Sequence, residues 1–291
     1  MVTYPSLQKA VIPAAGFGTR LRPLTQAFPK ELLPVGRKPV LAHIVAELQG
    51  AGITQLLFIV SERKPQIQNY FGETYREEGW EGQPLRCSYV VQEQQRGSGD
   101  AVLYAEEWVG KDPFLVVFGD CLVDAPDPSE PLRRLIATHQ TQQAATTVMV
   151  EKVAWEKVSH YGVLAPEAPQ PETPIEPFAA SDIVEKPARE AAPSNLVVAA
   201  RWACQPAIFE VLRRTPLDPR GELNLTDAVR ILRQEGGSLW AVPTRPGEAR
   251  RDIGNFESFF SAFVRFALRD AEYGEVVRRT IEEEWKNRPL G

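Results

Sequence analysis

Cysteine and histidine are both scarce in this sequence. Only three cysteines occur among 291 residues, and none belongs to a C-x-x-C pair (Cys87, Cys121 and Cys204). This count excludes a disulfide framework, and the three scattered histidines give no metal-binding cluster of the zinc type. We therefore expect a protein of a reducing compartment, the cytoplasm.

Long apolar runs and blocks of like charge are also absent. No segment approaches the roughly 18 consecutive apolar residues of a membrane-spanning helix. Residues 1–5 lead directly into the first expected strand, so we expect no signal peptide. The 33 basic and 38 acidic side chains give a net charge of −5, which argues against binding through bulk charge. We predict neither a nucleic-acid nor a membrane partner.

What the sequence does contain is a regular alternation of short apolar runs and helical patterns. The expected strands are brief, apolar and bounded by turn residues, and they cover residues 9–13, 55–60, 86–91, 114–118 and 144–150. The expected helices cover residues 40–48, 101–108 and 132–139. Such alternation implies parallel crossovers. It predicts an α/β fold: a Rossmann-like mixed, mostly parallel sheet flanked by helices.

The second half of the chain begins with a proline-rich stretch. Residues 165–178 cannot form a helix interior or a central strand, and strand-like runs resume on either side, so we expect a surface loop between strands. Towards the end, apolar residues recur at helical spacing from Phe256 to Ala267, and again at Val277, Ile281 and Trp285. These stripes predict C-terminal helices that face the core or another subunit.

A glycine-containing turn follows the first strand, with the sequence Ala14-Ala15-Gly16-Phe17-Gly18-Thr19-Arg20. Two glycines allow backbone N–H groups to approach an anion closely. A dinucleotide fingerprint would need a third glycine where Leu21 stands, and a Walker motif would need G-K-[ST] after Gly16. An ordinary turn would explain the glycines alone. It does not explain a long loop that also carries Arg20, Arg22 and Lys30, which together suit a polyanionic ligand.

The whole stretch resembles a known signature. The glycine turn followed by Pro29-Lys30-Glu31-Leu32-Leu33-Pro34 is similar to the sugar-1-phosphate nucleotidylyltransferases, and more narrowly to the bacterial UTP–glucose-1-phosphate uridylyltransferases. Further family-like segments follow in order, at residues 92–102, 118–120, 161–163, 184–187, 192–196, 221–228 and 251–255. The resemblance covers residues 9 to about 270.

The resemblance implies a nucleotide-diphospho-sugar transferase type of fold and a reaction. UTP and glucose 1-phosphate would give UDP-glucose and pyrophosphate. The alternatives are a thymidylyltransferase, or another sugar-1-phosphate nucleotidylyltransferase of the same fold. A non-catalytic nucleotide-sugar-binding regulator is a further alternative, although the presence of Lys30 and Asp120 argues against it. We also expect a homo-oligomer.

The resemblance also assigns site residues. It implies catalytic roles for Arg20 and Lys30, and it implies nucleotide binding by Ala14, Ala15, Gly16, Gly18, Thr19, Gln92 and Gly97. It implies sugar-phosphate binding by Gly162, Glu185 and Lys186, and a Mg²⁺ site at Asp120 and Asp252. Two aspartates without His or Cys fit Mg²⁺ better than Zn²⁺. Without the resemblance, Glu185–Lys186 would be a surface ion pair and Asp252 a turn residue.

Two more expectations follow from the same resemblance. A catalytic domain would span residues 1–254, with its sugar-binding part at about 151–254, and the helices of residues 255–291 would pack on it or lie at a subunit interface. Ala200 stands where the family usually has glycine near the sugar pocket.

Overall fold

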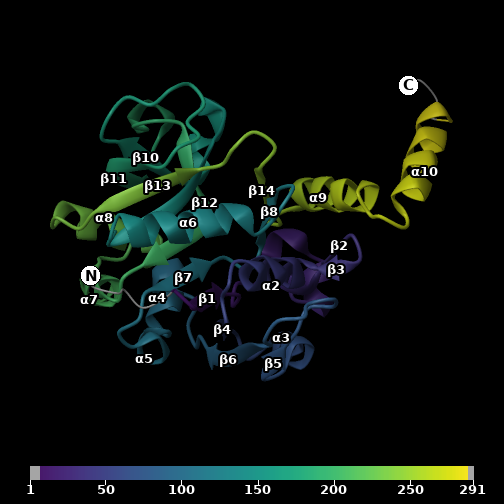
Figure 1. The fold of residues 1–291 in the computed structure, drawn as a ribbon, viewed down its shortest axis with the longest axis horizontal. Coiled ribbons are helices and arrows are strands. Elements are labelled where there is room, and N and C mark those ends of the chain that lie inside the picture. The colour runs from purple at the N-terminus through teal and green to yellow at the C-terminus, as the bar shows by residue number, and fades with distance from the viewer. Residues whose placement is uncertain (1–6, 288–291) are drawn as a thin grey trace.

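The computed structural model describes residues 7–287, and its centre is a ten-stranded mixed sheet (Figure 1). The strand order is β10-β11-β13-β9-β12-β7-β1-β4-β6-β5. The strands are β1 (Lys9–Pro13), β4 (Gln55–Val60), β5 (Thr74–Tyr75), β6 (Leu85–Val91), β7 (Phe114–Val117), β9 (Thr146–Lys152), β10 (Gly162–Pro166), β11 (Phe178–Glu185), β12 (Leu196–Cys204) and β13 (Leu239–Pro243). Two small ribbons pair β2 (Pro34–Val35) with β3 (Lys38–Pro39), and β8 (Cys121–Asp124) with β14 (Ala249–Asp252).

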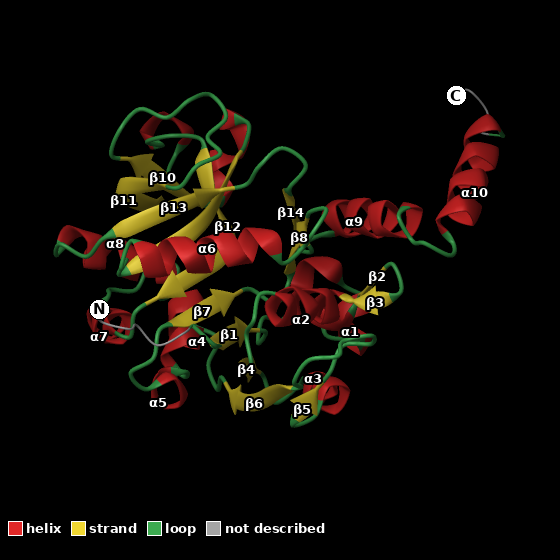
Figure 2. Ribbon diagram, in the orientation of Figure 1, coloured by secondary structure: helices red, strands yellow, loops and turns green. Residues whose placement is uncertain are grey.

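Helices cover both faces of this sheet (Figure 2). The α-helices of the described residues are α1 (Leu24–Ala27), α2 (Val40–Gly50), α3 (Pro65–Phe71), α4 (Ser98–Leu103), α5 (Glu106–Val109), α6 (Glu130–Thr141), α7 (Ala207–Arg214), α8 (Leu225–Gln234), α9 (Phe256–Leu268) and α10 (Gly274–Lys286). Strand β1 shows the two faces: Ala10 and Ile12 belong to the core under α2, α3 and α6, whereas Val11 belongs to the core under α4, α7 and α8. Within residues 7–287, no helix has the length and apolar character needed to span a bilayer.

The expectation of a mostly parallel sheet is wrong. Only β1–β4, β1–β7, β4–β6 and β9–β13 pair in parallel, and the other pairings of the sheet are antiparallel. Parallel neighbours need a long crossover, usually a helix. Between β9 and β12 the chain offers only the short 3-10 turns Trp155–His160 and Arg189–Ala191, so its strands return antiparallel. Because β12 also pairs with β10, the strands β10, β11, β13, β9 and β12 close into a ring.

Several sequence expectations hold with shifted bounds, and one helix is broken. The proline-rich stretch is the loop between β10 and β11. The helix expected at residues 101–108 is two short helices, α4 and α5, because Ala105 donates to the carbonyl of Val102 and the α-helical pattern stops there. Ala200 lies at an irregularity of β12 with φ of 60°, a left-handed conformation that glycine adopts without strain and alanine adopts at a cost of about 1 kcal/mol.

A buried ion pair joins the two halves of the fold. The guanidinium of Arg201 on β12 donates to both carboxylate oxygens of Glu47 on α2, at 2.8 and 2.7 Å. Both side chains are almost fully buried. Arg201 also donates to the carbonyl of Cys121 at 2.9 Å. This contact fixes the backbone directly after Asp120.

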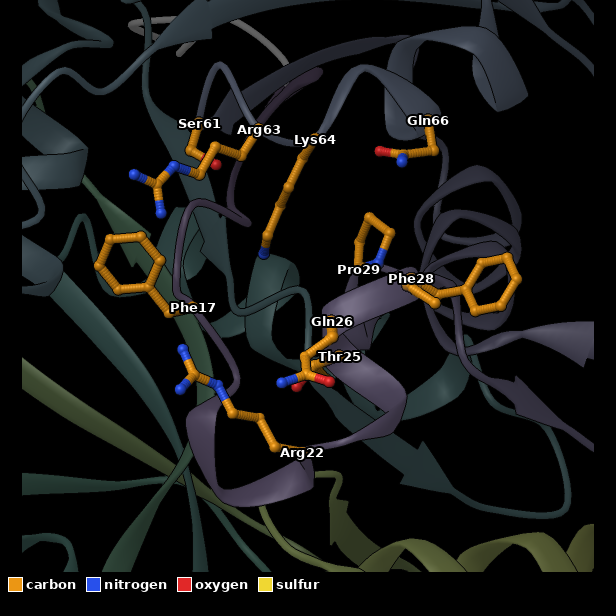
Figure 3. A pocket seen from close by; sticks show the side chains of 11 residues that line it. Phe17, Arg22, Thr25, Gln26, Phe28, Pro29, Ser61, Arg63, Lys64 and Gln66 are labelled. Atoms are coloured by element: carbon orange, nitrogen blue, oxygen red, sulfur yellow. The ribbon is translucent and has the colours of Figure 1, made fainter.

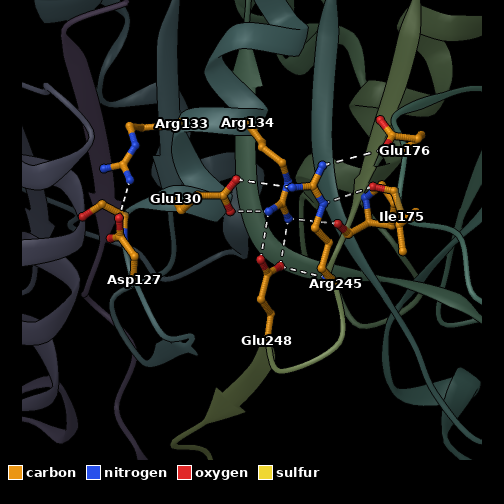
Figure 4. Close-up of polar contacts among 10 residues, drawn as sticks. Asp127, Glu130, Arg133, Arg134, Ile175, Glu176, Arg245 and Glu248 are labelled. Carbon is orange, nitrogen blue, oxygen red and sulfur yellow. Dashed lines mark hydrogen bonds and ion pairs between the residues drawn. The ribbon is translucent and has the colours of Figure 1, made fainter.

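A second polar network fixes the segment that leads to Asp252 (Figure 4). Arg134 on α6 donates to both oxygens of Glu248 at 2.8 Å and to the carbonyl of Pro243 at 3.2 Å. Glu248 also accepts from the backbone N–H of Arg245. These contacts anchor the connection between β13 and β14, and β14 ends at Asp252.

We predict that buried His139 makes the protein sensitive to acid. Its Nδ1 lies 3.1 Å from the hydroxyl of Thr147, and the amide nitrogen of Gln205 lies 3.2 Å from its Nε2. Burial lowers the pKa of His139 from 6.5 to about 4. The neutral ring therefore contributes stability in full above pH 6.5, and that contribution of about 3 kcal/mol is lost as the pH falls towards 4.

Urea unfolding of the wild type and of His139→Gln between pH 7 and pH 4.5 measures this effect. The variant should lose less stability on acidification than the wild type, whereas His160→Gln, at an exposed position, should follow the wild type. Parallel pH profiles for wild type and His139→Gln would contradict the prediction.

Candidate active site

The glycine turn leaves β1 at the carboxyl edge of the sheet. Ala14 and Ala15 are buried, whereas Gly16 and Thr19 are exposed. Gly18 has φ of 63°, a conformation that disfavours other residues. The hydroxyl of Thr25 donates to the carbonyl of Gly18 at 2.8 Å, which closes the loop on itself. The turn is therefore held in one defined conformation.

Lys64 holds this turn in place from behind. Its ammonium donates to the carbonyls of Ala14 and Gly16 at 2.7 and 2.6 Å, and to both carboxylate oxygens of Glu31 at 2.9 and 2.7 Å. Both side chains are buried. Burial raises the pKa of Glu31 and lowers the pKa of Lys64, although each charge opposes the other shift. The sequence analysis did not identify Lys64, although it follows β4 at the same sheet edge where ligands of such folds bind.

Lys30 and Asp120 form an ion pair at the floor of the site. Burial alone would lower the pKa of Lys30, but the carboxylates of Asp120 and Glu31 hold that pKa above its ordinary value. A methyl group added to Gly16 would lie 3.7 Å from the Lys30 ammonium. The expected catalytic lysine therefore lies against the glycine turn, and its ammonium stays charged throughout the physiological range.

Asp252 lies beside this pair, as the sequence predicted for a residue 132 positions away from Asp120. The backbone N–H of Ile253 donates to the carbonyl of Asp120 at 2.8 Å. Burial, together with the charge of Asp120, raises the pKa of Asp252, whereas the ammonium of Lys30 keeps the pKa of Asp120 low in spite of burial. A methyl group added to Gly254 would lie 3.2 Å from Arg20 Nη2 and 3.3 Å from Asp252 Oδ2. Two carboxylates and two cations thus meet next to the turn.

A cleft of about 350 Å³ opens above Lys30 and Asp120. It is also lined by Gly16, Gln92, Gln95, Gly97 and Glu222. Gln92 is buried, and its amide nitrogen donates to Asp100 Oδ2 at 2.6 Å. A carboxylate only accepts hydrogen bonds. Asp100 therefore fixes which way the Gln92 amide is turned, a feature that the sequence analysis missed.

Gly97 is required by its surroundings. Its φ is 106°, and a methyl group at this position would lie 2.4 Å from the carbonyl oxygen of Leu223. The carbonyl of Leu223 also accepts from the backbone N–H of Gly99 at 2.8 Å, and the backbone N–H of Leu223 donates to the carbonyl of Arg96 at 2.6 Å. The 221–228 motif therefore packs against the glycine loop of residues 92–102 and brings Glu222 to the cleft.

The expected sugar-phosphate residues lie apart from that cleft. Glu185 and Lys186 pair at 3.0 Å and line a neighbouring hollow of about 600 Å³ together with Asp218, Arg220 and Asp227. Lys186 has φ of 43°, a strained conformation for a lysine. A methyl group added to Gly162 would touch Thr226 and Val198 at 3.1 Å. Glu185 and Lys186 are therefore close to the site without lining the same cavity as Lys30.

Comparisons with known proteins can now be set beside this geometry. Residues 9–267 match the Nucleotidyl transferase family. The chain belongs to this family. The family resemblance predicted from the motifs is thereby confirmed. Among residues 7–287, no group of three or more His, Cys, Asp or Glu side chains is placed to hold a metal ion.

Individual members of the family are similar over nearly the whole chain. A UTP–glucose-1-phosphate uridylyltransferase of Mycoplasma pneumoniae is 35% identical, over 91% of this chain and 94% of its own. The UTP-bound UGPase of Acinetobacter baumannii is 31% identical, with a TM-score of 0.85, over 95% of this chain and 99% of its own. A UDP-glucose pyrophosphorylase complexed with UDP-glucose has a TM-score of 0.79 at 31% identity, covering 89% of this chain and 98% of its own.

Proposed function

We propose that this nucleotidyltransferase transfers a uridylyl group from UTP to glucose 1-phosphate, releasing pyrophosphate. The observation that carries the proposal is the arrangement of Lys30, Asp120 and Asp252 against the glycine turn, at the floor of the cleft that holds Gln92 and Gly97. The relatives that act on or bind these same substrates match the chain nearly end to end. Thymidylyl transfer is the alternative outcome of the test below.

The reaction needs charge neutralisation more than it needs a general base. A phosphate oxygen of glucose 1-phosphate, already ionised at neutral pH, attacks the α-phosphorus of UTP and displaces pyrophosphate in line. The anions repel each other, so cations and backbone N–H groups must hold them together. Lys30 contacts the reacting phosphates, and Arg20, beside Asp252 at the turn, contacts the departing pyrophosphate.

In this proposal, Gln92 determines which nucleotide base is bound. Its amide nitrogen is committed to Asp100, so the amide orientation does not vary between bases. A fixed amide distinguishes the donor and acceptor pattern of uracil from that of cytosine. Glu185 accepts from hexose hydroxyls and Lys186 pairs with the sugar phosphate. Ala14, Ala15, Gly16, Gly18, Thr19 and Gly97 supply backbone contacts to the nucleotide.

Asp120 and Asp252 would hold Mg²⁺. Their oxygen donors, and the raised pKa that burial and the negative charge of Asp120 impose on Asp252, fit a small divalent cation that takes one or two carboxylates. When bound, the ion would neutralise phosphate charge. We also propose that the protein works in the cytoplasm, where its three free cysteines stay reduced.

A panel of nucleoside triphosphates and sugar 1-phosphates tests the proposed reaction. With Mg²⁺, pyrophosphate release should be fastest with UTP and glucose 1-phosphate. Lys30→Ala should lower kcat/KM by at least about 100-fold, because a preorganised charge at the reacting phosphates is lost. Gln92→Leu should raise KM for UTP.

The matched control for Lys30→Ala is Lys111→Ala, which removes a lysine at an exposed position and should leave kcat/KM unchanged. A tenfold preference for dTTP over UTP would assign the chain to the thymidylyl branch. Near-normal turnover in Lys30→Ala would remove this lysine from the mechanism.

We predict that each proposed metal ligand changes the magnesium dependence. Asp120→Asn and Asp252→Asn keep the size of the side chain and remove one charge, so the Mg²⁺ concentration for half-maximal turnover should rise by at least about tenfold. Asp120→Asn should be the more severe change. Asp112→Asn, in a surface pair with Lys9, is the control. An unchanged profile for Asp120→Asn would overturn the metal assignment.

The chain division expected from the sequence stays a proposal: a catalytic unit of residues 1–254, with its sugar-binding part at about 151–254, followed by helices. Helix α9 buries Phe259 and Ala262 against the body, whereas α10 extends away from it (Figure 1). Exposed apolar side chains remain on both helices: Phe260, Phe263, Val264, Val276, Ile281 and Trp285.

We propose that α10 of a second copy packs against α9. Three arginines, Arg251, Arg265 and Arg269, share the single carboxylate of Asp124, so this surface carries excess positive charge. These arginines border an apolar groove with Phe260, Val264 and Leu268. Residues 282–284 of α10 are three consecutive glutamates beside the apolar Ile281, which complements that groove in charge and polarity.

Light scattering tests this interface. The wild type should be larger than one 32.5 kDa chain, and Ile281→Asp or Val264→Asp should reduce it to single chains. Ile175→Asp, at a similarly exposed isoleucine in the loop before β11, should have no effect. A monomeric wild type would overturn the proposal.

A further inference from the structure

A second pocket lies at the glycine turn beside the substrate cleft, and Phe17 lines both cavities. It has a volume of about 270 Å³ and is formed by residues 17–29 together with the start of the loop after β4 (Figure 3). Its lining includes Arg22, Gln26, Ser61, Arg63 and Gln66, and it contains no acidic side chain. Arg22, which the sequence grouped with Arg20 and Lys30, lines this pocket and not the cleft of Lys30.

The cations of this pocket are uncompensated. Within residues 7–287, neither Arg22 nor Arg63 forms an ion pair, and the guanidinium of Arg63 lies 5.8 Å from the centre of the Phe17 ring. Figure 3 shows the two guanidinium groups on either side of Phe17. The ammonium of Lys64 is already saturated by Glu31 and two carbonyls, so it adds no free charge. Both arginines are exposed, and each offers donors that no acceptor among the described residues takes up.

A buried hydroxyl points to the same conclusion independently. Ser61 is 93% buried, and its Oγ has no hydrogen-bond partner among the described residues. Buried polar groups without partners are rare in folded proteins and call for an explanation such as a missing ligand. Ser61 lines the pocket next to Arg63. An anion held by both arginines would also satisfy this hydroxyl.

We propose that this pocket binds a compact phosphorylated anion, at a site separate from the substrate cleft. Guanidinium groups and a hydroxyl are the donors that phosphate groups accept from. The volume is just below the roughly 300–1,000 Å³ of pockets for drug-sized ligands, so the ligand is inorganic phosphate, pyrophosphate or a small phosphate ester. Because Phe17 borders both cavities and Lys64 joins the pocket to the turn, a bound anion contacts the loop that shapes the active site.

Calorimetric titration of the full-length protein with inorganic phosphate, pyrophosphate and glycerol phosphate tests the site and separates the sources. Phosphate binding should be equal in wild type and Lys30→Ala, and Arg63→Gln should weaken it by about tenfold, since a charge-assisted contact is lost. Arg213→Gln, which removes an exposed arginine on α7, is the control and should bind as the wild type does.

Ser61→Ala distinguishes a ligand site from a structural role. Removal of an unpartnered hydroxyl should leave the melting temperature without phosphate unchanged or higher, while phosphate affinity falls several-fold. The proposal is overturned if none of the three anions binds, or if binding is lost in Lys30→Ala and kept in Arg63→Gln. Both outcomes are independent of the reaction proposed above, because neither measures turnover.

Discussion

The fold depends on burying opposite charges in pairs near the candidate active site. Arg201 and Glu47 lie in the centre of the molecule, where removal of either partner would leave an uncompensated charge at a cost of about 3–5 kcal/mol. The pair joins β12 to α2 and, through the Cys121 carbonyl, fixes the strand that begins after Asp120. The closed ring of strands and the parallel strands β7, β1, β4 and β6 are therefore held in one relative position at the candidate active site.

Pairs of opposite charge also hold the glycine turn. Lys64 and Glu31 hold the back of the glycine turn, and Lys30 and Asp120 lie at its front. Glu31 is adjacent in sequence to Lys30, so one short segment delivers the acid that fixes the turn and the cation that faces the cleft. Lys64 and Lys30 each have a carboxylate partner. Arg22 and Arg63 lie at exposed positions and form no ion pair among the described residues.

Rigidity of the site comes from contacts between its loops. The motif of residues 221–228 closes on the loop of residues 92–102 through backbone hydrogen bonds, and Gly97 permits an approach that any side chain would block. Arg134 anchors the segment before Asp252 from the opposite side. The walls and the floor of the candidate cleft are thus attached to different parts of the sheet.

The sequence by itself determined the local features: the buried strands, the glycine turn, the Lys30 segment and the aspartates at strand ends. These features can be predicted because burial of a strand or helix requires apolar residues at a regular spacing, and because turns need particular residues. Tertiary structure alone decided the closed ring of mainly antiparallel strands, since strand direction depends on which segments pair, not on their own composition. It also decided the pairing of Arg201 with Glu47, 154 positions apart, and of Lys64 with Glu31. The sequence around a loop lysine does not show whether its side chain is solvated or buried. Only the folded chain shows that Glu31, 33 residues away, lies against Lys64.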